Sequence, residues 1–211
     1  MKNLLALFAF AAAFALPALA PAAEPGKDYL VISPTVPVDV KKGQVEVLEF
    51  FWYRCPHCFD LETEVKAWAA KLPKGVVFTQ VPGILNPNWA TLARAYYALE
   101  AVGMLDRMHQ EVFDAIHVHG QDLNSPQRFL DWAAGKGVNR KQLADAFDSF
   151  AVNAKVMRAQ QLTNAYRLNG VPAFAVNGKF VTSAALAGGN ASLFKTLDEL
   201  IARELRRSGG K

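Results

Sequence analysis

Cysteine is scarce in this sequence, which has two cysteines and four histidines among its 211 residues. Cys55 and Cys58 stand in the run FWYRCPHCFD, and no second CxxC or closely spaced Cys/His pair completes the four ligands of a zinc site. A framework of several disulfides is also excluded, and a disulfide that closes so small a loop stabilises a chain little. The number and spacing of the cysteines therefore favour a redox pair that exchanges disulfides with other proteins over a metal site or a structural crosslink.

Long apolar runs are missing except near the N-terminus. The run Leu4–Leu16 is shorter than the roughly 18 to 20 residues that a membrane span needs. Lys2 precedes this run and the small residues ALAPAA follow it, which is the three-part layout of a secretory signal peptide. We therefore predict a signal peptide over residues 1–22, cleaved after Ala22, in preference to a membrane anchor.

A strong excess of one charge is also missing, since 23 basic residues stand against 19 acidic ones. Loss of Lys2 with the signal peptide leaves 22 basic residues, a weakly basic protein for which we predict no nucleic-acid binding. About 190 mature residues are enough for one compact core with an inserted subdomain.

The cysteines lie between a predicted strand and a predicted helix. VEVLEFFWY, residues 45–53, has the β-branched and aromatic composition of a strand buried on both faces. The following FDLETEVKAWAAKL has apolar residues near helical spacing, and Pro56 suits the first turn of that helix. Cys55 is then expected at the exposed N-terminal end of the helix, where free N–H groups and the helix dipole lower the pKa of a thiol. Cys58, one turn further, is expected to be more buried and to act as the resolving thiol.

The rest of the chain alternates between strand and helix patterns. A second strand is predicted over Val76–Val81, a helical block over residues 88–166, and an amphipathic helix from Asn190. Between the last two, VPAFAVNGKFVT predicts two short strands joined by Asn177-Gly178, a type I′ turn signal. This order predicts an α/β fold with an inserted helical subdomain.

These motifs resemble one known family. CPHC after EFF, a helical block and then GVPAFAVNGK are similar to the DsbA-type thiol:disulfide oxidoreductases of the bacterial envelope. The resemblance covers nearly the whole mature chain and implies a thioredoxin-like fold. The thioredoxin-like domain is expected over residues 23–87 and 167–211, with residues 88–166 as the helical insertion.

Catalysis of disulfide exchange is what the resemblance implies for the cysteines. A substrate thiolate attacks the sulfur of Cys55 to give a mixed disulfide, and a second substrate thiol then displaces Cys55, which leaves the substrate oxidised. His57 lies inside the loop, where its imidazole N–H or positive charge is expected to stabilise the Cys55 thiolate. We expect the isolated protein to hold a Cys55–Cys58 disulfide. We also expect reduction to stabilise the folded protein at neutral pH, with a difference that shrinks in strong acid.

Three further residues are expected at the site. By resemblance, the Val171–Pro172 peptide bond is expected to be cis and to face the cysteines, so that the backbone of Val171 can pair with an extended substrate segment. Glu49 interrupts the apolar strand, and a buried carboxylate with a raised pKa there could accept the proton of Cys58. An ordinary paired or partly solvated carboxylate is the alternative. Some relatives carry a lysine near the position of Gln80, so the charge balance around Glu49 stays open.

The leading functional prediction is an oxidase that donates its disulfide to dithiols of newly exported proteins in the periplasm. The resemblance implies reoxidation by a quinone-linked membrane partner of the DsbB type, and we predict a monomer with neither a cofactor nor a metal. A disulfide isomerase or reductase of the same fold is the alternative, which the Pro-His dipeptide and the lack of an N-terminal dimerisation module disfavour. A non-catalytic binding protein with an unused CxxC is the third class.

Overall fold

The structure is a computed structural model and describes residues 22–209, so the predicted signal peptide, apart from Ala22, lies outside the described residues. The strands are β1 (Leu30–Val31), β2 (Val45–Phe51), β3 (Val76–Pro82), β4 (Ala173–Val176) and β5 (Phe180–Thr182). The helices are α1 (Pro56–Ala69), the short 3-10 helix η1 (Pro87–Trp89), α2 (Ala90–Ala101), α3 (Leu105–His117), α4 (Pro126–Gly135), α5 (Arg140–Phe147), α6 (Phe150–Ala165), α7 (Ala184–Ala187) and α8 (Asn190–Gly209). Within residues 22–209 there is no helix with the length and hydropathy of a membrane span.

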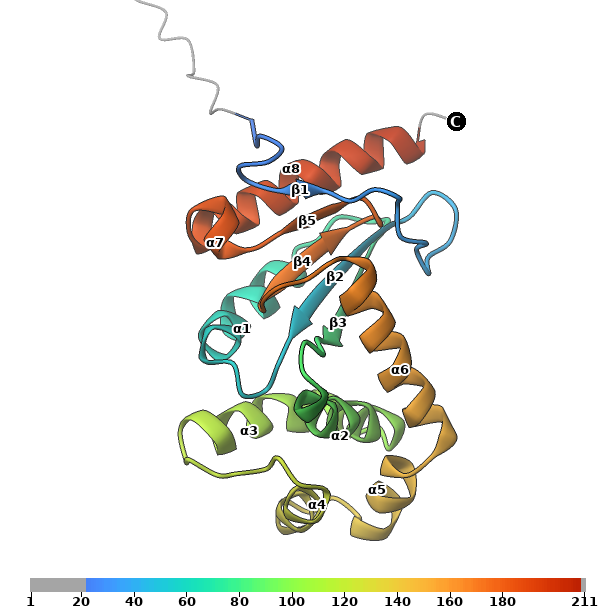
Figure 1. Cartoon of the computed structure of the whole chain (residues 1–211), viewed down its shortest axis with the longest axis vertical. Helices are drawn as coiled ribbons and strands as arrows, with labels where there is room; N and C mark the ends of the chain where they lie inside the picture. The colour runs from blue at the N-terminus through green and yellow to red at the C-terminus, as the bar shows by residue number, and fades with distance from the viewer. Residues whose placement is uncertain (1–21, 210–211) are drawn as a thin grey trace, which may run out of the picture.

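The strands form one mixed sheet in the order β1-β5-β4-β2-β3 (Figure 1). β2 runs parallel to β3 and antiparallel to β4, and the pairs β4–β5 and β1–β5 are antiparallel. All seven residues of β2 are buried, as VEVLEFF predicts for a strand covered on both faces. The strand ends at Phe51, two residues earlier than predicted, because the N–H of Cys55 bonds to the carbonyl of Trp52 and the chain turns there.

Two apolar clusters cover the two faces of the sheet. On one face, β2 and β4 pack against α1 and α8 through residues such as Val47, Leu61 and Leu197. On the other face, β2 contributes Leu48 and Phe50 to a larger core that extends through the helices α2 to α6. Because successive side chains of a strand point to opposite faces, one apolar strand supplies both clusters.

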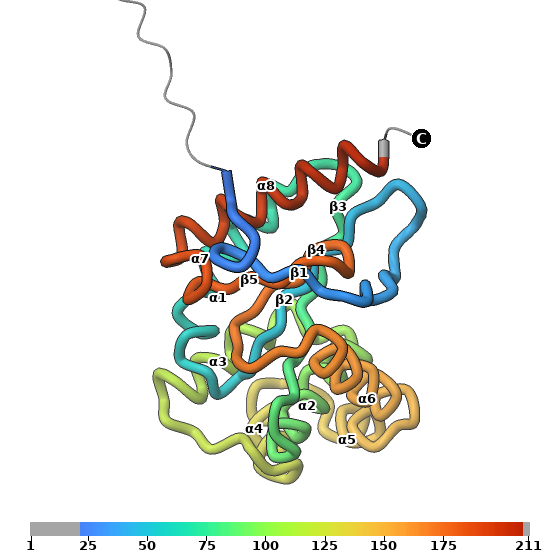
Figure 2. Tube along the Cα trace, turned by 45° about the horizontal axis from the view of Figure 1, so that its top comes forward, coloured from blue at the N-terminus to red at the C-terminus, as the bar shows by residue number. Residues whose placement is uncertain are grey.

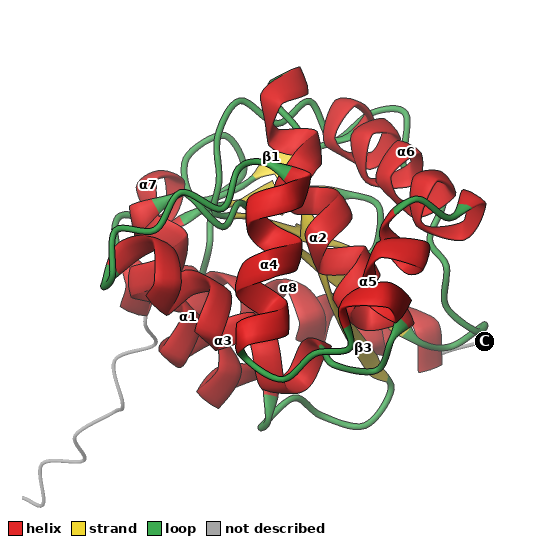
Figure 3. Ribbon diagram, turned by 90° about the horizontal axis from the view of Figure 1, so that it is seen from below, coloured by secondary structure: helices red, strands yellow, loops and turns green. Residues whose placement is uncertain are grey.

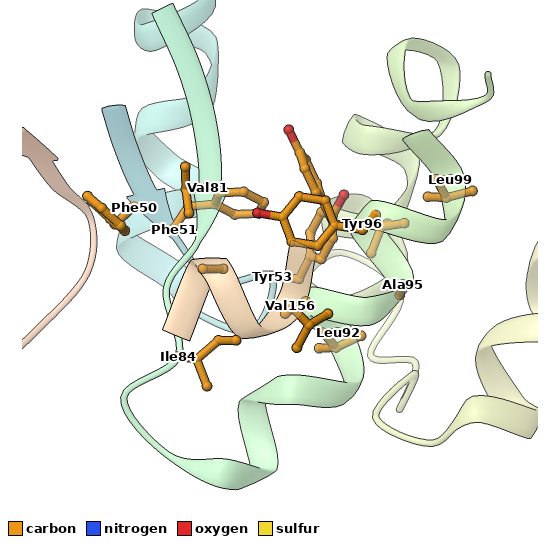
Figure 4. Close-up of a cluster of buried hydrophobic side chains, with 14 of the residues drawn as sticks. Phe50, Phe51, Tyr53, Val81, Ile84, Leu92, Ala95, Tyr96, Leu99 and Val156 are labelled. Carbon is orange, nitrogen blue, oxygen red and sulfur yellow. The ribbon is translucent and has the colours of Figure 1, made fainter. Parts of the chain in front are cut away.

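The helices α2 to α6 follow β3 and precede β4, and they form a block at one end of the sheet (Figure 1), which lies in front when the molecule is seen from below (Figure 3). Figure 4 shows where this block meets the sheet, with Phe51 and Tyr53 beside Tyr96 of α2. The rings of Phe51 and Tyr96 make a T-shaped contact with centroids 5.4 Å apart. The predicted α/β fold with a helical insertion is confirmed.

The hairpin between β4 and β5 turns at Asn177-Gly178, as predicted. Both residues have positive φ angles, 51° and 70°, which a type I′ turn requires. Gly178 is needed there for a second reason, since a Cβ atom would lie 2.0 Å from the carbonyl oxygen of Val36. The sequence did not predict β1 and α7, whose two and four residues are too short to show a period.

The described N-terminal segment lies beside the C-terminal helix α8 (Figure 2). The backbone N–H of Ala23 donates to Oε2 of Glu199 at 2.7 Å, and Arg203 donates to the hydroxyl of Tyr29 at 3.1 Å. These contacts fix the segment that leads into β1.

Candidate active site

The cysteines occupy the first turn of α1. Cys55 is the N-cap residue, with φ −84° and ψ 115°, and Pro56 follows at the first helical position, where its fixed φ suits the helix. The N–H groups of Cys58 and Phe59 both bond to the carbonyl of Cys55, each at 3.1 Å. Both sulfurs are therefore held at the start of the helix, and both cysteines are free thiols in the structure.

Cys55 is less accessible than the sequence predicts. Its exposed fraction is 8%, against 1% for Cys58. The cause is a tertiary contact, because the carbonyl oxygen of Val171, in the loop before β4, lies 3.4 Å from the sulfur of Cys55. Pro56 and His57, between the two cysteines, are exposed. His57 is thus the ionisable residue of the motif that faces solvent.

The surroundings of the two thiols push their pKa values apart. The thiol of Cys58 donates to the sulfur of Cys55 and is the main reason why the pKa of Cys55 falls to about 6. The N–H groups of Cys58 and His57 and the charge of His57 act in the same direction, against burial. Burial and then the contacts with Cys55 raise the pKa of Cys58. At pH 7 the pair is then mainly a Cys55 thiolate beside a Cys58 thiol, which disulfide exchange uses as leaving group and resolving thiol.

Val171, whose carbonyl oxygen contacts the Cys55 sulfur, is followed in the chain by Pro172. Their peptide bond is cis, as predicted. Together with His57 and Ala184 they line a cavity of about 680 Å³ beside the CxxC. The loop before β4 and the exposed end of α1 therefore meet around one hollow, large enough for a peptide side chain.

Glu49 is fully buried on β2, with an exposed fraction of 0%. Its Oε2 accepts a hydrogen bond of 2.9 Å from Nε2 of Gln80, its neighbour on β3, while Oε1 has no partner among the described residues. Burial first, and then the charge of Glu62, raise the pKa of Glu49 to about 8, although the Gln80 bond opposes this. The structure thus places a buried carboxyl with a raised pKa where the sequence predicts one.

Sequence reasoning missed Glu62 and His109, which Gln80 connects to Glu49. Nε2 of Gln80 also donates to Oε2 of Glu62 at 3.1 Å, so one amide joins two acids. Oε1 of Glu62 lies 3.4 Å from Nε2 of His109, whose Nδ1 lies 2.8 Å from the hydroxyl of Tyr53. We call these five residues, Glu49, Gln80, Glu62, His109 and Tyr53, the buried acid cluster.

Two aromatic contacts fix the chain around the cysteines. The rings of Trp52 and Trp89 stack with centroids 4.0 Å apart. His117 stacks on Phe59 at 4.9 Å, and its Nε2 donates to the carbonyl of Tyr53 at 2.8 Å. His117 is therefore half-buried and holds the segment before Cys55.

Comparison with known proteins agrees with this geometry. The family model described as the DSBA-like thioredoxin domain matches residues 61–200. The chain belongs to the DsbA family. The thiol:disulfide interchange protein DsbA of Pseudomonas aeruginosa is 36% identical over 206 residues, which cover 97% of each chain. DsbA of Bordetella parapertussis is 42% identical over 198 residues, which cover 92% of this chain and 94% of that one. The crystal structure of P. aeruginosa DsbA has a TM-score of 0.83 at 36% identity and covers 88% of this chain and 96% of that chain.

As a DsbA family member, the protein is a thiol:disulfide oxidoreductase with a thioredoxin fold. The family match begins at Leu61, three residues after Cys58. The family match does not include the two cysteines, so their catalytic role stays a prediction that their geometry supports.

Proposed function

We propose that this DsbA family member is a dithiol oxidase, which donates its Cys55–Cys58 disulfide to other proteins through a mixed disulfide on Cys55. The observation that carries the proposal is the split between a Cys55 pKa of about 6 and the raised pKa of Cys58. Each pH unit by which the pKa of Cys55 lies below the ambient pH stabilises the reduced form by about 1.4 kcal/mol, or roughly 30 mV. A Cys55 thiolate that leaves easily therefore favours donation of the disulfide.

The proposed reaction begins when a substrate thiolate attacks the sulfur of Cys55. The bond between Cys55 and Cys58 breaks, and Cys58 leaves as a thiolate that needs a proton, because burial raises its pKa. Glu49 is the proposed donor, since a carboxyl with a pKa of about 8 is mostly protonated at pH 7. It is also close enough to Cys58 that its charge, when it is ionised, raises the pKa of that thiol. A second substrate thiolate then attacks the substrate sulfur of the mixed disulfide. Cys55 leaves as a thiolate, the substrate gains a disulfide, and the protein has taken up two electrons.

The substrate segment is proposed to lie in the cavity beside the CxxC. The backbone of Val171 would pair with it, and Pro172 and His57 would contact it from either side. The approach of the Val171 carbonyl to the Cys55 sulfur supports this position, since a segment paired there has its own cysteine close to Cys55.

The reaction is proposed to take place in the periplasm, after export and removal of the signal peptide behind Ala22. One contact supports this cleavage site. The nitrogen of Ala23 lies 2.7 Å from Oε2 of Glu199, so the amino group created by cleavage would pair with a carboxylate. The proposed partners are newly exported cysteine-containing proteins and a quinone-linked membrane oxidase of the DsbB type, and the protein is proposed to act as a monomer. The domain boundaries at residues 87/88 and 166/167 stay predictions.

Two measurements test the proposed function. When mixed with a peptide disulfide, the Cys58→Ala variant is expected to stop at a mixed disulfide through Cys55, and the matched Cys55→Ala variant is expected to form none. A redox titration against glutathione is expected to give a strongly oxidising potential. A strongly reducing potential would instead assign the protein to the reductases or isomerases of the same fold.

A further inference from the structure

Two acids of the buried acid cluster share a single amide. Nε2 of Gln80 donates to Glu49 at 2.9 Å and to Glu62 at 3.1 Å. The amide is neutral and cannot balance two negative charges, and two carboxyl groups so close together in a buried site do not both ionise readily. A proton on one of the two acids relieves this repulsion, and the acid that holds it decides whether Cys58 faces a proton donor.

The two acids have different surroundings. Glu49 has no exposed surface, and its Oε1 has no partner among the described residues. The side chain of Glu62 is 8% exposed, and its Oε1 lies 3.4 Å from Nε2 of His109. A negative charge costs less on the acid that has an imidazole nitrogen within ion-pair distance and some contact with water. This asymmetry favours the charge on Glu62 and the proton on Glu49.

Tyr53 orients the ring of His109. Burial raises the pKa of Tyr53 well above its ordinary value, so its hydroxyl keeps its proton beside Nδ1 of His109, 2.8 Å away. A neutral ring that accepts this proton at Nδ1 carries its own hydrogen on Nε2, and a charged ring has a hydrogen there as well. Nε2 makes no hydrogen bond with the described residues, so its hydrogen is available to Glu62.

The titratable groups that face His109 within the described structure come from three segments. They are Glu62 of α1, Tyr53 of the loop between β2 and α1, and Tyr96 of α2, whose ring centroid lies 5.8 Å from that of His109. Burial is also the first cause that raises the pKa of Tyr96, so both tyrosines stay neutral. Glu62 is therefore the group whose charge the ring can stabilise.

We propose that His109 is a positioning residue for the proton transfer to Cys58. Its Nε2–H holds the negative charge on Glu62, which keeps the proton on Glu49. When Cys58 leaves as a thiolate, the proton of Glu49 moves to the Cys58 sulfur and Glu49 becomes a carboxylate. Solvent then returns a proton to the cluster at Glu62 and His109, whose side chains are 8% and 10% exposed. This inference rests on the proposed oxidase function and adds a role for a residue that touches no reacting atom.

The test compares His109→Leu with His109→Gln in the full-length protein. Leucine fills the space without an N–H, whereas glutamine supplies an amide N–H near the position of Nε2. NMR of isotope-labelled glutamate carboxyl carbons, assigned with Glu49→Gln and Glu62→Gln, reports which acid is protonated at pH 7. We expect a protonated Glu49 in the wild type and in His109→Gln. In His109→Leu we expect the proton to move largely to Glu62, and the rate of peptide oxidation to fall several-fold.

A double variant shows whether His109 acts through Glu62. Adding His109→Leu to Glu62→Gln is expected to change the oxidation rate no further, because the charge that His109 stabilises is already gone. The inference is overturned if Glu49 stays protonated in His109→Leu, or if glutamine and leucine at this position behave alike. A wild type that fails to oxidise the peptide overturns the proposed function instead, and the NMR result still reports the position of the proton.

Discussion

The sulfur of Cys55 lies 3.4 Å from the carbonyl oxygen of Val171, a residue 116 positions later in the chain. The contact joins the start of α1 to the loop before β4, two of the segments that border the cavity beside the CxxC. A thiol can donate to this carbonyl and a thiolate cannot. The donors that stabilise the thiolate therefore come from the other side, from Cys58 and from the first turn of the helix.

The causes of the low Cys55 pKa differ in size, which gives a first prediction. The thiol of Cys58 contributes most and the charge of His57 least. We expect Cys58→Ala to raise the pKa of Cys55 from about 6 by more than His57→Ser does, and Cys58→Ser, which keeps a hydroxyl donor, to raise it less than Cys58→Ala. Ultraviolet absorbance of the thiolate as a function of pH measures all three values. A larger effect of His57→Ser than of Cys58→Ala would contradict this order.

Gly83 lies behind Val171 and gives a second prediction. A Cβ atom at Gly83 would stand 2.9 Å from Cγ1 of Val171, so Gly83→Ala must displace the stiff valine side chain. We expect a several-fold fall in kcat/KM for peptide oxidation while the pKa of Cys55 changes little. The double variant Gly83→Ala/Val171→Ala removes the clash and should recover most of the loss, with Val171→Ala alone as the control. No recovery in the double variant would show that Gly83 acts elsewhere.

Local sequence patterns predicted the strand, the helix start and the hairpin turn that position the site. The contacts between distant segments depended on tertiary packing. The apolar run VEVLEFF, Pro56 after Cys55 and Asn177-Gly178 each specify a short piece of backbone, so the sequence was sufficient for them. Glu49 stood out because an acid interrupts an apolar strand. Glu62 and His109 did not, because each looks ordinary on its own helix and only the packing of α1 against α3 brings them together.

The limited exposure of Cys55 was missed for a similar reason. The start of a helix is commonly open to water, and the sequence near Cys55 contains no residue that would cover it. Val171 covers it from a distant segment. The spacing of CPHC therefore predicted the kind of chemistry, while the accessibility of the sulfur depended on how the loop before β4 packs.

The contact between Ala23 and Glu199 gives a third prediction, about processing. N-terminal sequencing of the exported protein is expected to begin at Ala23, whose amino group would then pair with Glu199. Because this pair is partly exposed, Glu199→Gln should lower the free energy of unfolding of the mature protein by no more than about 1 kcal/mol, and less at high salt. The uncleaved precursor, which has a neutral N–H there, should lose less. A mature chain that begins at another residue would contradict the proposed cleavage site.

The buried carboxyl of Glu49 gives a fourth prediction. Its pKa of about 8 in the folded protein lies above the unfolded value of about 4.3, so stability falls as pH rises between these two values. At pH 7 the cost is on the order of 3 kcal/mol, which Glu49→Gln should recover because the amide does not titrate. Near pH 4 the variant should gain nothing. Urea unfolding of both proteins at the two pH values measures the difference, and an equal effect at both would exclude a raised pKa.

The redox state of the cysteines gives the last prediction, in which two contributions oppose each other. A disulfide that closes this small loop stabilises the oxidised form by about 2 kcal/mol through the entropy of the unfolded chain. The Cys55 thiolate stabilises the reduced form, since its folded pKa of about 6 lies below the unfolded value of about 8.5. This second contribution is complete above the unfolded pKa and is lost as pH falls through the folded pKa.

Near neutral pH the contributions of the crosslink and of the thiolate to the free energy of unfolding are similar in size. At pH 7 the thiolate contributes about 1.4 kcal/mol, less than the crosslink, and at pH 8 it contributes about 2.5 kcal/mol. The advantage of the reduced form that the sequence predicts at neutral pH is therefore expected near pH 8, and at pH 5 the oxidised form should be more stable by about 2 kcal/mol. The raised pKa of Cys58 has the opposite sign and limits the gain above pH 8. Urea unfolding with and without reductant at pH 5, 7 and 8 tests this, and His57→Ser should reduce the change with pH only slightly, because the charge of His57 contributes least to the low pKa of Cys55. A stability difference that does not vary with pH would mean that Cys55 is not a stabilised thiolate, and would favour the reductase alternative over the oxidase.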